Sequence, residues 1–139
     1  MKKILIATHG NLAEGALSSL KIIAGEIENI TYINAFTEEK NIDKALLNYF
    51  STCNEEDQII VLTDIFGGSV NQAAIKFIPK GNVFLITGFN LALLLEIAMM
   101  NPEENVDEEK IKEIIKNSQK QIMFVNDVIN STTEEDFFD

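Results

Sequence analysis

The chain has 139 residues, 46% hydrophobic and 24% charged, a composition typical of one globular domain and not of a disordered or membrane-spanning protein. Eleven basic against 22 acidic side chains leave a formal net charge of −11, which repels nucleic-acid phosphates and anionic bilayers. We therefore expect no nucleic-acid partner, and the single Cys53 and single histidine exclude an internal disulfide and disfavour a zinc site.

The first half of the chain alternates buried strands with amphipathic helices. Residues 4–7 form a continuous apolar run, typical of a parallel strand covered on both faces, and this run ends at His9. Apolar residues then recur at three- and four-residue spacing over residues 12–24, which predicts a helix. Residues 30–36 are rich in β-branched and aromatic side chains and predict a second strand, followed by a second helix over residues 42–50.

The same alternation continues in the second half of the chain. Residues 58–63 read as a third buried strand, which ends in a polar turn before a helix over residues 70–77. Residues 79–82 predict a turn and residues 83–87 a fourth strand. An apolar helix is then expected over residues 91–100, too short to span a bilayer.

The C-terminal part of the chain is more polar. A last helix is expected over residues 105–119, with carboxylates in its first turn, where they favour the helix dipole. Residues 121–125 predict a short edge strand, and residues 130–139 predict an acidic, loosely held tail.

This order of elements predicts a single α/β domain over residues 1–129, with a doubly wound, mainly parallel sheet of about four strands. Right-handed crossovers would place helices on both faces of the sheet. The apolar run at the N-terminus is too short for the core of a signal peptide, so we expect a cytoplasmic protein.

Two side chains with chemical potential follow neighbouring strands. His9 ends the first strand and Asp64 follows the third, and in such sheets ligands bind at the carboxyl ends of strands where the strand order reverses. A carboxylate that accepts a hydrogen bond from one imidazole nitrogen leaves the other nitrogen free to attack. Asp64 would therefore orient His9, and His9 would act as a nucleophile in phosphoryl transfer.

Backbone groups near these residues could hold a phosphate without a metal. Gly67, Gly68 and Ser69 open a helix, where unpaired N–H groups and the helix dipole favour an anion. Gly10 precedes a second helix and adds a further candidate. Each residue also has a structural interpretation: a lone histidine is often structural, paired glycines often form a tight turn, and Asp64 could cap the following helix. These residues alone do not decide between a site for phosphate chemistry and purely structural roles.

In three segments the chain resembles the mannose-family IIA proteins of the phosphoenolpyruvate-dependent sugar phosphotransferase system. These segments are residues 4–10, residues 63–71 and residues 88–91, and the resemblance extends over nearly the whole chain. Their combination in this order is specific to the family, whereas each alone would be weak. Two positions depart from the pattern, because Val70 stands where many members have proline and residues 91–93 lack the proline often found there.

The resemblance implies a function and a set of partners. His9 would accept a phosphoryl group from the histidine-phosphorylated carrier protein HPr and pass it to a separate IIB component, which phosphorylates sugar entering through the membrane subunits IIC and IID. No cofactor is implied. Family members are usually cytoplasmic homodimers that exchange a C-terminal strand, for which residues 121–125 are the candidate here.

Three alternatives remain at this point. A receiver domain would make Asp64 the phosphoacceptor, but receivers carry an acidic pair after the first strand, where this chain has Thr8 and His9. A dihydroxyacetone-kinase phosphotransferase subunit would share the first strand and its histidine, whereas residues 64–69 favour the mannose family. A phosphorylation-dependent regulatory protein is the third, and the sugar itself is not encoded in these residues.

Overall fold

Strands and helices alternate along the chain as the apolar pattern predicts. The computed structural model describes residues 1–37 and 40–131, and within them four parallel strands form one sheet: β1 (Lys2–His9), β2 (Ile30–Ala35), β3 (Gln58–Thr63) and β4 (Val83–Thr87). The helices of the described residues are α1 (Leu12–Ala24), α2 (Ile42–Ser51), α3 (Ser69–Ile75), the 3-10 helix η1 (Ile78–Lys80), α4 (Leu91–Ala98), α5 (Glu108–Gln119) and α6 (Val125–Ser131). The predicted α/β class and four-stranded parallel sheet are confirmed.

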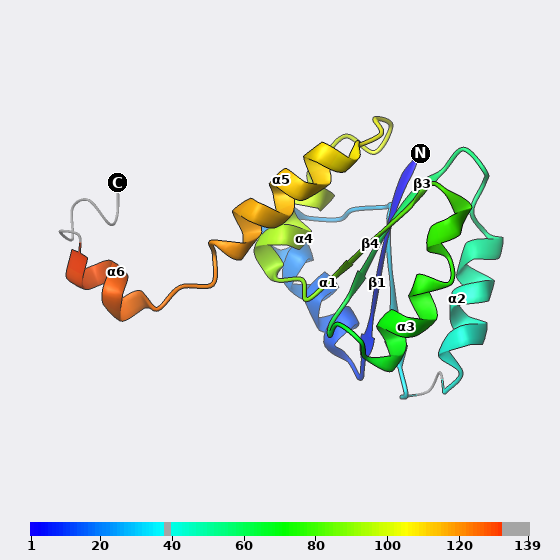
Figure 1. The fold of residues 1–139 in the computed structure, drawn as a ribbon, viewed down its shortest axis with the longest axis horizontal. Coiled ribbons are helices and arrows are strands. Elements are labelled where there is room, and N and C mark those ends of the chain that lie inside the picture. Colours follow the sequence, from blue (N-terminus) through cyan, green and yellow to red (C-terminus); the bar gives the residue numbers. More distant parts are fainter. Residues whose placement is uncertain (38–39, 132–139) are drawn as a thin grey trace.

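Helices cover both faces of this sheet, which explains the unbroken apolar run of β1 (Figure 1). Ile4 and Ile6 point into a core formed with α1, α4 and α5. Leu5 and Ala7 point into a second core formed with α2 and α3. Alternate residues of one central strand therefore pack into opposite layers, so the consecutive positions 4–7 are all apolar.

The sheet has the strand order β2-β1-β3-β4, so the chain reverses its direction of winding between β1 and β3. These two strands are paired in parallel, with Ala7 opposite Thr63. Their carboxyl ends therefore lie side by side at one edge of the sheet, which is the position where open α/β sheets bind ligands.

Several predicted boundaries were wrong by a few residues. β1 begins at Lys2, whose ammonium group is buried and donates to the carbonyls of Asn101 and Glu104 at 3.0 and 2.9 Å. α3 ends at Ile75, before the position expected for it, and η1 replaces part of the predicted turn. α4 ends at Ala98, two residues earlier than expected. α5 starts at Glu108, because the Asp107 carboxylate caps it by accepting the Lys110 N–H at 2.8 Å.

The segment after α5 differs from the expected edge strand. Residues 121–124 form no strand in the single chain but lead to α6, which projects away from the sheet (Figure 1). An exchanged strand would need a second chain, so that expectation stays a prediction. Of the expected tail, residues 130–131 belong to α6 and the remainder lies outside the described residues. No helix in the described ranges is long and apolar enough to cross a membrane.

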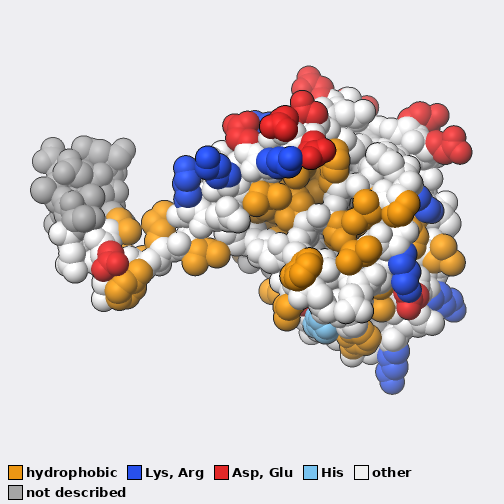
Figure 2. Space-filling model, in the orientation of Figure 1, with side chains coloured by type: hydrophobic (Ala, Val, Ile, Leu, Met, Phe, Trp, Pro, Cys, Tyr) orange, Lys and Arg blue, Asp and Glu red, His pale blue; other side chains and the backbone are white. Residues whose placement is uncertain are grey.

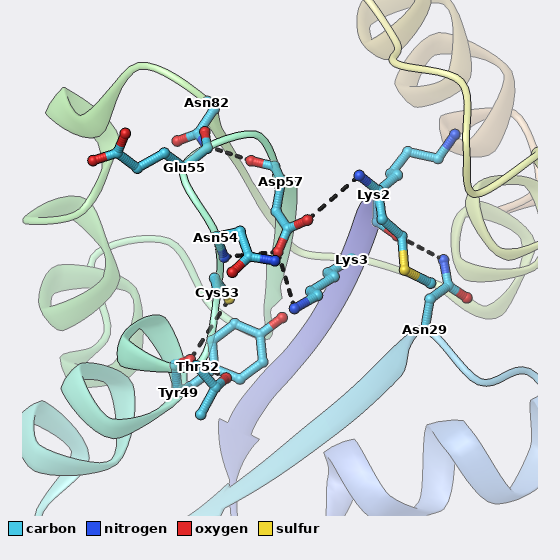
Figure 3. Close-up of polar contacts among 11 residues, drawn as sticks. Lys2, Lys3, Asn29, Tyr49, Thr52, Cys53, Asn54, Glu55, Asp57 and Asn82 are labelled. Carbon is cyan, nitrogen blue, oxygen red and sulfur yellow. Dashed lines mark hydrogen bonds and ion pairs between the residues drawn. The ribbon is translucent and has the colours of Figure 1, made fainter.

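A polar cluster closes the end of the sheet opposite His9 (Figure 3). The buried carboxylate of Asp57 accepts the backbone N–H of Asn54 at 2.9 Å and forms an ion pair with the Lys3 ammonium at 3.0 Å. The Asn82 side-chain amide donates to the carbonyls of Glu55 and Asp57. The Asn54 hydrogen bond, followed by the Lys3 hydrogen bond, holds the pKa of Asp57 below its ordinary value.

Candidate functional site

The sheet topology brings His9 and Asp64 together at the carboxyl ends of β1 and β3. The backbone N–H of His9 donates to Asp64 Oδ2 at 3.0 Å, and the ring nitrogen Nδ1 lies 2.9 Å from the same oxygen. The carboxylate is largely enclosed, with its side chain 9% exposed, whereas the imidazole is 42% exposed. One partner is thus held inside the protein, and the other reaches the surface.

The Asp64 carboxylate has hydrogen-bond donors on both oxygens. Burial opposes its ionisation, but the hydrogen bonds from the His9 backbone N–H and ring outweigh that cost, and the pKa of Asp64 falls below its ordinary value. Its second oxygen, Oδ1, accepts the N–H of Ile65 at 3.1 Å. Because an ionised carboxylate only accepts hydrogen bonds, it selects the imidazole tautomer with the proton on Nδ1 and leaves a lone pair on Nε2.

Ser69 lies beside that second ring nitrogen. Its hydroxyl oxygen is 3.3 Å from His9 Nε2, at the first residue of α3. Gly67 has a φ of 76°, which turns the chain into the helix. A Cβ on Gly68 would lie 3.4 Å from His9 Cε1 and 3.3 Å from the Ile65 carbonyl, so a glycine there allows the helix start to approach the ring closely.

The Gly10 region does not offer the free donors expected of it. The Gly10 N–H donates to the carbonyl of Ala35 at 2.9 Å, so in this conformation it is not available to a phosphate. The next helix start is also occupied, because the Thr8 hydroxyl accepts the Ala13 N–H at 2.8 Å and the Asn34 side chain accepts the Glu14 N–H at 3.2 Å. The N–H groups of Gly10, Ala13 and Glu14 are therefore already used inside the protein, and the start of α3 remains the candidate source of donors.

One neighbour of His9 was missed from the sequence. The ring centroid of Phe36 lies 5.4 Å from that of the imidazole, with the planes tilted by 35°. Phe36 follows β2 directly, and the carboxyl end of that strand lies beside the end of β1, because Ala35 is paired with His9. The one signal in the sequence was the position of Phe36 at the carboxyl end of the predicted second strand, β2. Its residue type gave no indication of a functional role.

Exposed hydrophobic side chains lie around His9. Figure 2 shows the His9 side chain at the surface among hydrophobic side chains, and most acidic side chains of this face lie at the opposite end. Leu12, Ile65 and Phe66, which are near His9 or Asp64 in the sequence, are 54%, 60% and 81% exposed. Among residues 1–37 and 40–131, no three His, Cys, Asp or Glu side chains come together as a metal site would require.

Comparison with known proteins points to one family. The family described as "PTS system fructose IIA component" matches residues 3–115. Over 105 residues the chain is 30% identical to the mannose-specific EIIAB component of Escherichia coli (strain K12), which is 73% of this chain. The match covers 32% of the E. coli protein, so the chain spans about a third of that relative's length.

Two further relatives match over more of their length. The chain is 29% identical over 100 residues to the fructose-specific EIIA component of Bacillus subtilis (strain 168), covering 70% of this chain and 68% of that one. Among solved structures, the PTS IIA protein associated with the fucose utilization operon of Streptococcus pneumoniae superposes with a TM-score of 0.79 and 30% identity. That superposition covers 92% of this chain and 96% of the other.

Proposed function

The chain belongs to the IIA family of sugar phosphotransferase systems that includes mannose- and fructose-specific components, and on this basis we propose that it is a phosphocarrier with His9 as its phosphoacceptor. The observation that carries the proposal is the fixed imidazole. Asp64 binds Nδ1 at 2.9 Å, while the ring reaches the surface with Nε2 beside Ser69.

The chemistry follows from the tautomer that Asp64 selects. The Nε2 lone pair of His9 attacks the phosphorus of a phosphohistidine on HPr, the donor's N–P bond breaks, and the donor imidazole keeps the electron pair of that bond. The Nδ1 proton stays on the His9 ring, which becomes positively charged, and the Asp64 carboxylate stabilises that charge. The reverse sequence delivers the phosphoryl group to a IIB component.

The phosphoryl oxygens would be held from the side of α3. A group bound to Nε2 lies next to the Ser69 hydroxyl and to the first backbone N–H groups of this helix, whose dipole favours an anion. Gly67 and Gly68 support this arrangement through the turn and the close approach described above. The role of Gly10 in this proposal is limited to its left-handed turn, with a φ of 59°, because its N–H is already bound.

Asp64 is poorly suited to be the phosphoacceptor itself, as a receiver domain would need. Its side chain is 9% exposed, Oδ2 contacts two groups of His9, and Oδ1 accepts the N–H of Ile65. An attack by either oxygen would break these hydrogen bonds and move a largely enclosed group to the surface. The enclosed carboxylate therefore favours the positioning role.

The proposal extends to partners and assembly. HPr is the proposed phosphoryl donor, and a separate IIB component is the proposed acceptor. Through IIB the protein would act indirectly on the membrane subunits IIC and IID during sugar uptake. We place the protein itself in the cytoplasm. We include a homodimer that exchanges the segment around residues 121–125. Ile122 and Phe124 in this segment are 77% and 67% exposed, and burying such side chains against a second chain would be favourable.

The experiment is transfer of labelled phosphate from phosphoenolpyruvate through purified enzyme I and HPr to the full chain. We expect HPr-dependent label that is acid-labile and base-stable, and that a purified IIB component removes. His9→Ala contains no histidine and should carry no label, whereas Ser69→Ala keeps the phosphoacceptor and should still be labelled. Base-labile label that disappears in Asp64→Ala would instead indicate an acyl phosphate and refute the proposal.

A further inference from the structure

Phe36 has a backbone conformation that is unusual for its residue type. Its φ is 66°, and among the described residues it is the only non-glycine residue with a positive φ. A bulky side chain rarely adopts this left-handed region, because the Cβ then crowds the backbone, and such strain often marks a functional position. Glycine or asparagine would fit the same turn with less strain.

Burial in the core does not explain the strain. Phe36 is 48% exposed and belongs to neither hydrophobic core. Its ring contact is the His9 imidazole, at 5.4 Å between centroids. The strained residue therefore places an aromatic ring against the residue proposed to carry the phosphoryl group.

The turn that carries Phe36 is fixed to the elements that carry His9. The carbonyl of Ala35 accepts the Gly10 N–H, which follows His9 directly. Asn34 exchanges two hydrogen bonds with Glu14 of α1, and the Thr37 hydroxyl donates back to the Asn34 carbonyl at 2.8 Å. Hydrogen bonds on both sides of Phe36 thus fix the turn from which its ring projects.

The imidazole has three kinds of neighbour, and each limits a different motion. Asp64 fixes Nδ1, and Gly68 and Ser69 lie along the edge that contains Cε1 and Nε2. All of these contacts come from the connection between β3 and α3 and from the first residue of α3. Phe36 approaches from β2, on the other side of β1, and no other described aromatic ring contacts His9.

We propose that Phe36 is a positioning residue, whose ring holds the imidazole in the orientation that presents Nε2 to the phosphoryl donor. This inference rests on the proposed function of His9. Asp64 sets which nitrogen carries the proton, and Phe36 limits rotation of the ring away from the α3 donors. Small errors in the position of a reacting atom cost large factors in rate, so an exposed histidine benefits from such a contact.

The first measurement reads His9 in the unphosphorylated full-length protein. Because His9 is the only histidine, ¹⁵N-labelled protein gives one set of ring signals by nuclear magnetic resonance. In Phe36→Ala we expect altered ring-proton shifts and exchange broadening, and in Phe36→Tyr we expect signals close to those of the parent. Phe66→Ala removes another exposed aromatic ring near Asp64 and should leave the His9 signals unchanged.

The second measurement is single-turnover phosphoryl transfer from phosphorylated HPr. In Phe36→Ala we expect the maximal rate constant to fall about tenfold, with the HPr concentration at half-maximal rate changed by less than about twofold. Phe36→Tyr keeps an aromatic ring at this position and should transfer phosphate at close to the parental rate. Phe36→Asn relieves the backbone, so it should be as slow as the alanine variant while its melting temperature stays within about 2 °C of the parent.

The outcomes separate this inference from its alternatives. Parental His9 signals and a parental rate constant in Phe36→Ala would overturn it, and a rise in half-saturating HPr alone would assign Phe36 to docking instead. A large loss of melting temperature in Phe36→Asn would indicate a structural role. If neither the parent nor any variant is labelled, but the ring signals still change as expected, the proposed phosphocarrier function is refuted while the positioning of His9 by Phe36 stands.

Discussion

Replacing Asp64 by asparagine tests the electrostatic part of the proposed mechanism, because the change keeps the shape and removes the charge. The carboxylate lies 2.9 Å from His9 Nδ1, and the ring gains a positive charge when Nε2 is phosphorylated. A hydrogen bond to a charged group contributes roughly 1.5–3 kcal/mol, against about 1 kcal/mol for a neutral one. The amide therefore loses about 0.5–2 kcal/mol of this stabilisation.

A second cost comes from geometry. Oδ2 accepts the N–H groups of the His9 backbone and ring, and Oδ1 accepts the N–H of Ile65, so either orientation of the amide places its NH₂ against a donor. Water screens part of the charge effect, since the His9 side chain is 42% exposed. We take a net loss of about 2 kcal/mol, which slows transfer about 30-fold.

Rapid-quench measurement of phosphohistidine formation from phosphorylated HPr gives this rate constant directly. His9→Ala sets the background, and circular dichroism checks that Asp64→Asn keeps its fold. A rate for Asp64→Asn within about twofold of the parent would mean that the carboxylate does not stabilise the phosphorylated ring, and the reasoning would fail.

Two further predictions concern the packing of the site and the stability of the opposite end of the sheet. Gly68→Ala keeps an allowed φ of −68°, but its Cβ would lie 3.3 Å from the Ile65 carbonyl oxygen and 3.4 Å from His9 Cε1, so the turn beside the ring has to shift slightly. We expect a small loss of melting temperature and transfer about tenfold slower in the same assay. Asp57→Ala leaves the Lys3 ammonium and the Asn54 N–H without their buried partner, so urea unfolding at pH 7 should show a loss of about 2 kcal/mol. Because the pKa of Asp57 is lowered on folding from 3.8, this contribution is complete above that value and disappears as the pH falls through the lower folded pKa. The difference in stability between the parent and Asp57→Ala should therefore begin to shrink as the pH falls below about 4, and a constant difference down to pH 2 would contradict this account.

The local pattern of the sequence was sufficient for the architecture. The apolar run of β1 indicates a strand that is buried on both faces, and the three- and four-residue spacing of α1 indicates a helix that is buried on one face. Burial of apolar surface is the main favourable contribution to folding. Short connections between alternating strands and helices leave few topologies, and these share one binding edge. For this reason the sequence alone was enough to select His9 and Asp64 and to predict that they meet.

Contacts between distant parts of the chain decided the rest. His9 and Ser69 are 60 residues apart, and their 3.3 Å separation depends on the pairing of β1 with β3 and on the start of α3. Two further contacts depend on how β2 ends beside β1. They are the hydrogen bond from the Gly10 N–H to the Ala35 carbonyl and the contact between the Phe36 and His9 rings. Residue type and local spacing carry no information about such distances, because they arise only when the whole sheet assembles and competing hydrogen bonds are satisfied together.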